Sequence, residues 1–254
     1  MLIDTHCHIH WKDFPLDISD LIQRANTAGV ARMICIGTNI SDSKLAVKFA
    51  SSHKNVYSSI GVHPNDSRDK IEDLDKIINS NNRSIVAIGE IGLDYFHKNC
   101  PHDIQIKALN KQIELALKND LPIIFHVRDA FEDFWPIFDN FITNGQKIRG
   151  ELHSFTDNQE NLEEALKRDL YIGVNGFSTF TKNKEQQILY ANIPLENLLL
   201  ETDAPFLTPV PFRGKVNEPA YVWEIAKWQS EVRQISFDEI ASITTANANK
   251  LFRL

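Results

Sequence analysis

The chain has 254 residues, of which 43% are hydrophobic and 24% are charged, and this composition is that of an ordinary soluble globular protein. It excludes a disordered chain, a collagen-like repeat and a disulfide scaffold. The 27 basic and 34 acidic residues leave a net charge of −7. The chain therefore lacks the overall positive field that draws proteins onto long DNA or anionic lipid, and any polyanionic partner has to be held by local charges.

The cysteines and the N-terminal residues indicate the cellular compartment. Cys7, Cys35 and Cys100 form an odd set without a C-x-x-C spacing, which fits neither a disulfide framework nor a zinc site made of thiolates. The first ten residues carry charge and histidine, and no apolar run approaches the roughly 18 residues of a membrane helix. We therefore expect a cytoplasmic protein with no signal peptide, no membrane span and no membrane partner.

Short apolar runs rich in β-branched residues recur along the chain, each followed by a segment of helical length. These runs predict eight strands: Leu2–Asp4, Arg32–Gly37, Val56–Val62, Ile85–Glu90, Pro122–His126, Ile148–His153, Leu170–Val174 and Asn197–Glu201. Several runs are apolar at consecutive positions, which is typical of parallel strands covered by helices. Between them apolar residues recur near the helical period, for example between Leu109 and Leu117.

Eight strand–helix units in about 250 residues predict a (β/α)8 TIM barrel. No break in composition, linker or low-complexity stretch interrupts the alternation, so we expect a single domain over residues 1–254. An open doubly wound sheet is the alternative. No strand, however, is followed by the G-x-G-x-x-G or Walker loop with which many such sheets bind nucleotides.

Candidate metal ligands stand at the ends of six of these strands. His6 and His8 follow the first strand two positions apart, so both imidazoles lie on one face while Cys7 lies on the other. The residues that end strands three to six and strand eight are His63, Glu90, His126, His153 and Asp203. Barrels build their active sites at this rim, and a carboxylate at the end of an apolar strand is costly to bury unless a cation neutralises it.

Of these candidates, we expect six to bind metal: His6, His8, Glu90, His126, His153 and Asp203. Four imidazoles and two carboxylates exceed the three or four protein ligands that a single zinc ion takes, so the set predicts two divalent ions bridged by Glu90. Two such ions acidify a shared water, which is the chemistry of a binuclear hydrolase. Imidazole-rich sites suit zinc, manganese or iron, whereas hydrolysis of phosphodiesters often uses magnesium, so the identity of the metal stays open.

The same residues stand in an ordered series of motifs: D-x-H-C-H, G-V-H-P, I-G-E-I-G-L-D-Y, H-x-R-D-A, L-H-S-F and E-T-D-A-P-F-L, followed by R-G-K-x-N-E-P. This series resembles the TatD family of metal-dependent deoxyribonucleases, in the branch that retains the N-terminal H-x-H. The resemblance implies a (β/α)8 barrel of the metallo-dependent hydrolase type. It also implies a two-metal site that cleaves DNA, commonly from the 3′ end.

The resemblance further implies how the ligands are divided between the two ions. One ion is assigned to His6, His8, Glu90 and Asp203, and the other to Glu90, His126 and His153. His63 is implied to lie behind these ligands or to contact a substrate phosphate.

We therefore expect a 3′–5′ exodeoxyribonuclease that prefers single strands, in which the ions activate a hydroxide for in-line attack on a phosphodiester. Glu90 and Asp203 are the expected catalytic residues, with Asp203 as an acceptor of the water's proton. The expected contacts to substrate phosphates are His63, Arg128, Arg213 and Lys215. The partner is then the end of a DNA strand, and no obligate protein partner is implied.

Two other classes of function stay open. A binuclear amidohydrolase or esterase would use the same hydroxide on a cyclic amide, a lactone or an aminoacyl-tRNA. Many such sites bridge their metals with a carboxylated lysine, whereas strand four offers Glu90. The other class is a metal-binding or nucleic-acid-binding module without catalysis, which metal-restored turnover would exclude.

Overall fold

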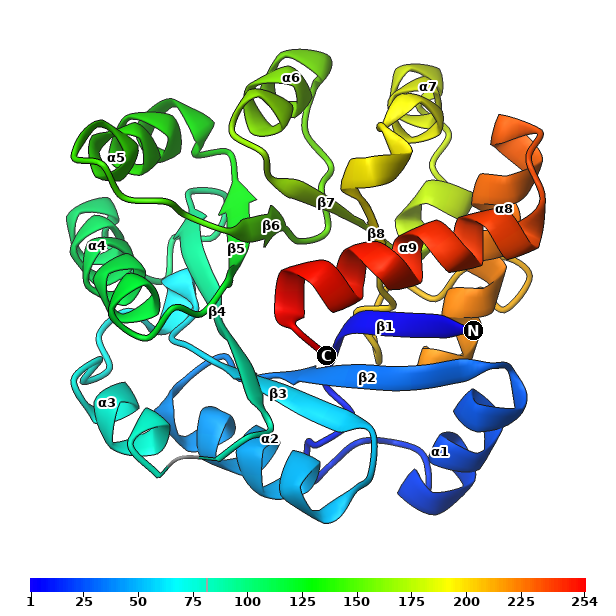
Figure 1. Ribbon diagram of the computed structural model, residues 1–254, viewed down its shortest axis with the longest axis horizontal. Helices are drawn as coiled ribbons and strands as arrows, with labels where there is room; N and C mark the ends of the chain where they lie inside the picture. Colours follow the sequence, from blue (N-terminus) through cyan, green and yellow to red (C-terminus); the bar gives the residue numbers. More distant parts are fainter. Residues whose placement is uncertain (81) are drawn as a thin grey trace. The chain divides into compact units, whose positions relative to one another are not determined.

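The computed structural model describes residues 1–80 and 82–254, in which strands and helices alternate (Figure 1). The strands of the described residues are β1 (Leu2–Cys7), β2 (Val30–Ile36), β3 (Val56–Ile60), β4 (Ile85–Asp94), β5 (Ile123–Arg128), β6 (Gly150–Leu152), β7 (Tyr171–Val174) and β8 (Leu198–Leu200). All eight strands expected from the sequence are present. The fourth continues beyond Glu90, its predicted end, to Asp94.

The helices lie between these strands and after the last one. Those of the described residues are α1 (Ile18–Thr27), α2 (Ile40–Ser52), α3 (Asp73–Ile78), α4 (His102–Lys118), α5 (Phe131–Thr143), α6 (Gln159–Lys167), α7 (Lys184–Asn192), α8 (Val222–Arg233) and α9 (Phe237–Phe252). Several begin at a polar side chain that accepts a hydrogen bond from the first turn, as Asp17, Asn39 and Asn158 do. None of the described helices combines the length and the apolar character needed to span a membrane.

The strands follow one another in the sheet in chain order, from β1 to β8, and their pairing is parallel. This order is that of a (β/α)8 barrel, and it confirms the predicted fold class. Parallel neighbours require a crossover between them, which the helices supply. In this fold class the active site is built from residues that follow the carboxyl ends of the strands.

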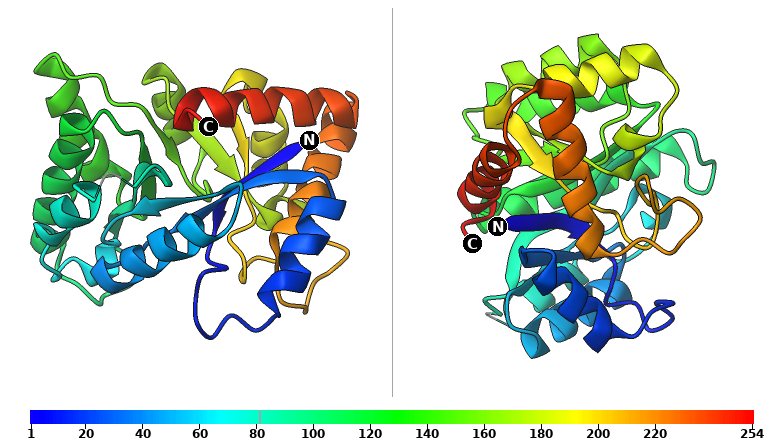
Figure 2. Two further views of the ribbon diagram at one scale, coloured as in Figure 1. Left: turned by 60° about the horizontal axis from the view of Figure 1, so that its bottom comes forward. Right: turned by 90° about the vertical axis from the view of Figure 1, so that its right-hand side faces the viewer.

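The chain forms two compact units, of which the first comprises Met1–Cys35 and Ser154–Leu254. In this unit β1 pairs with β2, β7 pairs with β8, and α9 packs against β1 (Figure 1). Figure 2 shows the loop after β8 beside α1, where the Arg24 Nε donates to the Glu218 carboxylate at 2.9 Å. The organisation of residues 1–254 as a single domain stays a prediction.

The second unit, Ile36–His153, is stabilised by an aromatic cluster between β5 and α5. The ring of Phe125 lies edge to face against Phe134 and Phe138, with centroids 5.1 and 5.9 Å apart, and all three side chains are fully buried. Such pairs contribute about 0.5–1.5 kcal/mol each beyond the burial of their surface. Phe125 directly precedes His126, so the cluster fixes the part of β5 that carries this candidate ligand.

Replacement of Phe134 by alanine is expected to lower the free energy of unfolding by about 3–5 kcal/mol, because it opens a cavity among these rings. Urea denaturation followed by circular dichroism measures the loss. Ile142→Ala is the matched control, since Ile142 lies in the same helix and is 40% exposed. We expect it to cost less than about 1 kcal/mol, and equal losses in the two variants would contradict the role of the cluster.

Candidate metal centre

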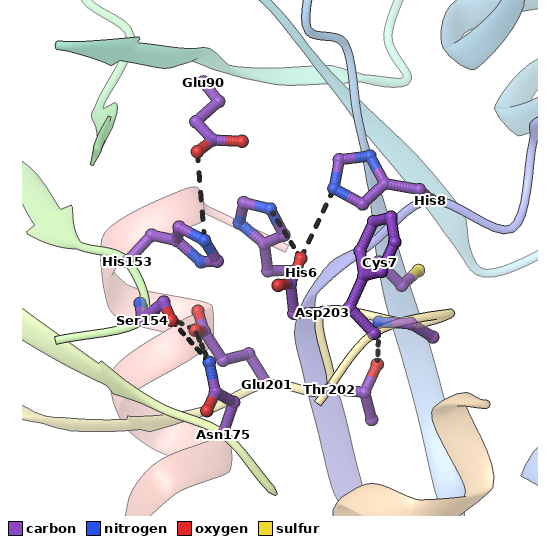
Figure 3. Close-up of polar contacts among 12 residues, drawn as sticks. His6, Cys7, His8, Glu90, His153, Ser154, Asn175, Glu201, Thr202 and Asp203 are labelled. Carbon is purple, nitrogen blue, oxygen red and sulfur yellow. Dashed lines mark hydrogen bonds and ion pairs between the residues drawn. The ribbon is translucent and has the colours of Figure 1, made fainter. Parts of the chain in front are cut away.

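Three candidate ligands of the first unit meet at the end of β1. The imidazoles of His6 and His8 turn toward Asp203 (Figure 3), whose Oδ1 lies 3.7 Å from the His6 Nε2 and 3.4 Å from the His8 Nε2. Ligand atoms of the three residues all lie within 4.8 Å of one another. Two imidazoles and a carboxylate at these separations fit a divalent cation.

Backbone hydrogen bonds hold Asp203 in this position. The Asp203 N–H donates to the His6 carbonyl and the His8 N–H donates to the Ala204 carbonyl, both at 2.8 Å, so the segment after β8 runs along the end of β1. Asp203 has a left-handed φ of 57°. Aspartate tolerates this region better than most residues, and such backbone persists where the surrounding structure holds it, often at functional sites.

Asp4 is a buried acid that was not among the candidates from the sequence. Its Oδ1 accepts the Thr202 N–H at 2.8 Å and its Oδ2 accepts the Thr202 hydroxyl at 2.6 Å. Burial raises the pKa of Asp4 well above its usual value, although the hydrogen bonds from Thr202 and from the His6 N–H oppose the rise. Through its hydrogen bonds with Thr202, Asp4 connects β1 to the segment that carries Asp203. Its position two residues before His6, on the same strand face, was the available signal.

Glu201 is a second buried acid, and it contacts the residue that follows His153 in the chain. Its Oε1 accepts the Ser154 N–H at 2.8 Å and lies 3.4 Å from the Asn175 Nδ2 (Figure 3). Gly173 makes room for the carboxylate, because a Cβ there would lie 2.5 Å from the Glu201 Oε2. Glu201 thus fixes the backbone of the loop after β6.

Glu90 is the centre of the candidate ligands in the second unit. Its Oε1 lies 2.7 Å from the His126 Nδ1, 3.6 Å from the His63 Nε2 and 3.8 Å from the His153 Nε2. Burial raises the pKa of Glu90, but the imidazoles of His63, His153 and His126 outweigh burial and hold this pKa well below its usual value. Glu90 is therefore a carboxylate, which is the form that binds a cation.

Asp94, at the end of β4, is a further acid that was absent from the predicted ligands. Its Oδ2 lies 3.2 Å from the His126 Nε2 and 2.8 Å from the His97 Nδ1. Burial lowers the pKa of His126, but the hydrogen bonds of this ring with Asp94 and Glu90 outweigh burial and raise it. Ligand atoms of His63, Asp94 and His126 lie within 4.8 Å of one another, so this group also fits a cation.

Two of the predicted phosphate contacts lie in the second unit. The His63 Nδ1 accepts the Asn65 N–H at 3.2 Å, and its Nε2 is the atom that faces Glu90. Arg128 ends β5, and its guanidinium lies 3.9 Å from the ring centroid of Phe96, which is 54% exposed. Contact of His63 and Arg128 with substrate stays a prediction.

The other two predicted phosphate contacts lie in the loop after β8. The Arg213 guanidinium lies 3.7 Å from the centroid of the Phe180 ring, and its Nη1 donates to the Thr208 carbonyl at 2.8 Å. The Lys215 ammonium lies 5.3 Å from the centroid of the Phe212 ring. An aromatic ring orients each cation without neutralising its charge. Contact of either residue with substrate also stays a prediction.

The sequence profile of the family described as TatD related DNase matches residues 3–253. The chain belongs to the TatD family. YabD of Bacillus subtilis, named an uncharacterized metal-dependent hydrolase, is 40% identical, with 100% of both chains covered. The 3′-5′ ssDNA/RNA exonuclease TatD of Salmonella typhimurium is 35% identical over 100% of this chain and 99% of its own. The crystal structure of the TatD homologue YJJV of Escherichia coli superposes with a TM-score of 0.92 at 29% identity, covering 100% of this chain and 98% of that one.

These matches confirm the family resemblance that the motifs carry, and they identify the chain as a metal-dependent hydrolase of the TatD family. The two groups of imidazoles and carboxylates within the described residues supply the nitrogen and oxygen donors that a divalent metal requires. The donor set therefore fits the metal dependence of the TatD family.

The partly buried His63 predicts a loss of stability in mild acid. Burial, assisted by the neighbouring His126 imidazole, lowers the pKa of His63 from 6.5 to about 4. The unfolded chain then binds more protons at this residue than the folded chain, so its contribution to stability is present above about pH 6.5 and is lost as the pH falls toward about 4. At about 1.4 kcal/mol per unit of pKa, the loss approaches about 3 kcal/mol.

Urea denaturation of chelator-treated protein at about pH 7 and about pH 4.5 measures this loss. His63→Gln removes the titrating ring and is expected to lose about 2 kcal/mol less than the wild type between these two pH values. His102→Gln, at an exposed histidine of α4, is the matched control and is expected to follow the wild type. Parallel curves for the wild type and His63→Gln would refute the assignment.

Proposed function

We propose that the chain is a metal-dependent 3′–5′ exonuclease that removes nucleotides from the ends of single-stranded DNA. The observation that carries the proposal is the gathering of imidazoles around a carboxylate in each unit, around Asp203 in the first and around Glu90 in the second. The name of the Salmonella relative, a 3′-5′ ssDNA/RNA exonuclease, supports the polarity and the preference for single strands. The net charge of −7 favours a substrate held at its end over a long duplex held by a broad basic surface.

We propose that two divalent ions are bound, with Glu90 as the shared ligand that the family resemblance implies. The proposed ligands are His6, His8, Glu90, His126, His153 and Asp203. Imidazole-rich sites suit zinc or manganese, whereas magnesium prefers oxygen donors and would depend on Glu90 and Asp203. Ions bound by these residues would acidify a water molecule and neutralise charge on the scissile phosphate.

Two residues of the candidate site, the ligand Asp203 and the neighbouring His63, have separate proposed roles. The Asp203 side chain is 15% exposed, so water reaches its carboxylate, and we assign it as the acceptor of the attacking water's proton. Because the pKa of His63 is lowered to about 4, its ring is neutral near pH 7, and its Nδ1 accepts from Asn65. The ring proton therefore lies on Nε2, which we assign as a donor to a phosphate oxygen.

Three cations complete the proposed binding of the strand. Arg128, Arg213 and Lys215 are assigned to phosphates of the substrate, since each lies at a loop or strand end and against an aromatic ring. The described cysteines are free and buried, which supports the reducing cytoplasm as the compartment of the enzyme. DNA ends are then the substrate within that compartment.

The test is hydrolysis of single-stranded DNA by protein that has been stripped with a chelator and resupplied with magnesium, manganese or zinc. With a 5′ label we expect a metal-dependent ladder of strands shortened stepwise from the 3′ end. Glu90→Gln is expected to slow this shortening by about 10²-fold or more, because it removes the shared carboxylate. Glu114→Gln, at an exposed glutamate of α4, is the matched control and is expected to keep the wild-type rate.

The alternatives give different results in the same preparation. Metal-bound protein that leaves DNA intact but hydrolyses a lactone, a cyclic amide or an aminoacyl ester would replace the nuclease with an amidohydrolase or esterase. Metal-bound protein that turns over none of these substrates would indicate a module without catalysis. Internal cuts in place of a 3′ ladder would contradict the exonuclease assignment.

A further inference from the structure

The turn after β1 folds Trp11 back over the candidate ligand His8. The Trp11 N–H donates to the His8 carbonyl at 3.2 Å, and the Phe14 N–H donates to the Trp11 carbonyl at 3.1 Å, so two tight turns follow the strand. The indole stacks on the His8 imidazole with ring centroids 4.6 Å apart and planes inclined by 26°. Trp11 is only partly buried. Its indole therefore covers a candidate ligand and still reaches the surface.

Phe206 lies beside this indole and is 51% exposed. It comes from the loop after β8, where its N–H donates to the Asp203 carbonyl at 2.8 Å. Its ring meets the Trp11 indole edge to face, with centroids 5.8 Å apart. Trp11 and Phe206 thus form an aromatic pair in which each residue is anchored to the backbone of a candidate ligand.

The backbone that presents Phe206 is held in place on both sides. Leu207 has a left-handed φ of 53°, which is rare for leucine, and a Cβ at Gly176 would lie 1.9 Å from the Leu207 carbonyl oxygen. The Asn217 side chain donates to the Phe206 carbonyl and, at 2.8 Å, to the Thr202 carbonyl. Exposure of a large apolar ring and strain in the backbone beside it both lower stability. Such features are typical of binding surfaces.

We propose that Trp11 and Phe206 form a stacking site for the base of the nucleotide whose phosphate is cleaved. This inference rests on the proposed nuclease function. Within one nucleotide a single sugar separates the base from its phosphate. Trp11 contacts His8 directly, and Phe206 is hydrogen-bonded to the backbone of Asp203. A base stacked on this pair would therefore have its phosphate close to His8 and Asp203. Aromatic faces stack on any base, whereas a base at a duplex end is held by its partner strand and by the neighbouring base pair, so the pair favours single-stranded ends without reading sequence.

The test compares kcat/KM on two 3′ ends of the same single strand. One end carries thymidines, and the other carries tetrahydrofuran residues, which lack a base, at the last two positions. Base stacking contributes about 1–3 kcal/mol, so Phe206→Ala is expected to lower kcat/KM on the thymidine end by about 5–150-fold and to leave the base-free end unchanged. Ile188→Ala, at a 60% exposed residue of α7, is the matched control and is expected to change neither.

Two outcomes separate this inference from the nuclease proposal. Equal losses in Phe206→Ala on both ends, with a fully active wild type, would overturn the stacking site and leave the nuclease standing. A wild type that cleaves neither end would refute the nuclease. Phe206→Tyr keeps an aromatic face, so we expect it to retain the activity on the thymidine end that Phe206→Ala loses.

A binding measurement tests the stacking site without turnover. Thymidine 5′-monophosphate is expected to quench part of the tryptophan fluorescence of the metal-loaded wild type, and this part is expected to vanish in Trp11→Phe. The chain has four tryptophans, so the variant isolates the signal of Trp11. A wild type whose fluorescence is unaffected by the nucleotide overturns the stacking site whether or not the chain cleaves DNA.

Discussion

The carboxylate of Glu90 is buried among three imidazoles, and the cost of burying this charge constrains the second unit around it. A buried carboxylate is tolerated when hydrogen bonds and opposite charge compensate its lost hydration, and removal of such a partner costs several kcal/mol. The strands that carry the imidazoles must therefore be held closely. The aromatic cluster around Phe125 holds β5 in place. A Cβ at Gly92 would lie 1.8 Å from the His126 carbonyl oxygen, so only glycine allows β4 and β5 to approach each other this closely.

The first unit also buries acidic side chains, and its acids have different contacts. Asp203 faces the imidazoles of His6 and His8, whereas Asp4 and Glu201 accept hydrogen bonds from the backbone of Thr202 and Ser154. These two acids hold the segments from which candidate ligands project. A metal site needs this outer layer, because the geometry of the ligands is only as exact as the groups that orient them.

The sequence predicts the strands and most of the candidate ligands because a parallel barrel brings the ends of its strands to the active site. Asp94 was missed because β4 was expected to end at Glu90, whereas the strand continues through Gly92. The supporting roles of Asp4 and Glu201 depend on partners far away in the chain, which spacing along a strand does not encode. Trp11 lies in the loop after β1 and Phe206 in the loop after β8, so only the folded chain brings their rings together.

An acidic enzyme that acts on a polyanion needs attraction that does not depend on its net charge. Arg213, held over Phe180, offers one local positive charge, and each further phosphate contact would add to the dependence of binding on salt. Stacking of a base on Trp11 and Phe206 supplies affinity without charge, so its contribution survives where ionic contacts are screened. In the proposed nuclease only the terminal nucleotides need to be held, so this combination would suffice to bind the end of a strand. A net charge of −7 is then compatible with a nuclease, since repulsion of the rest of the strand opposes the wrapping that a long duplex would require.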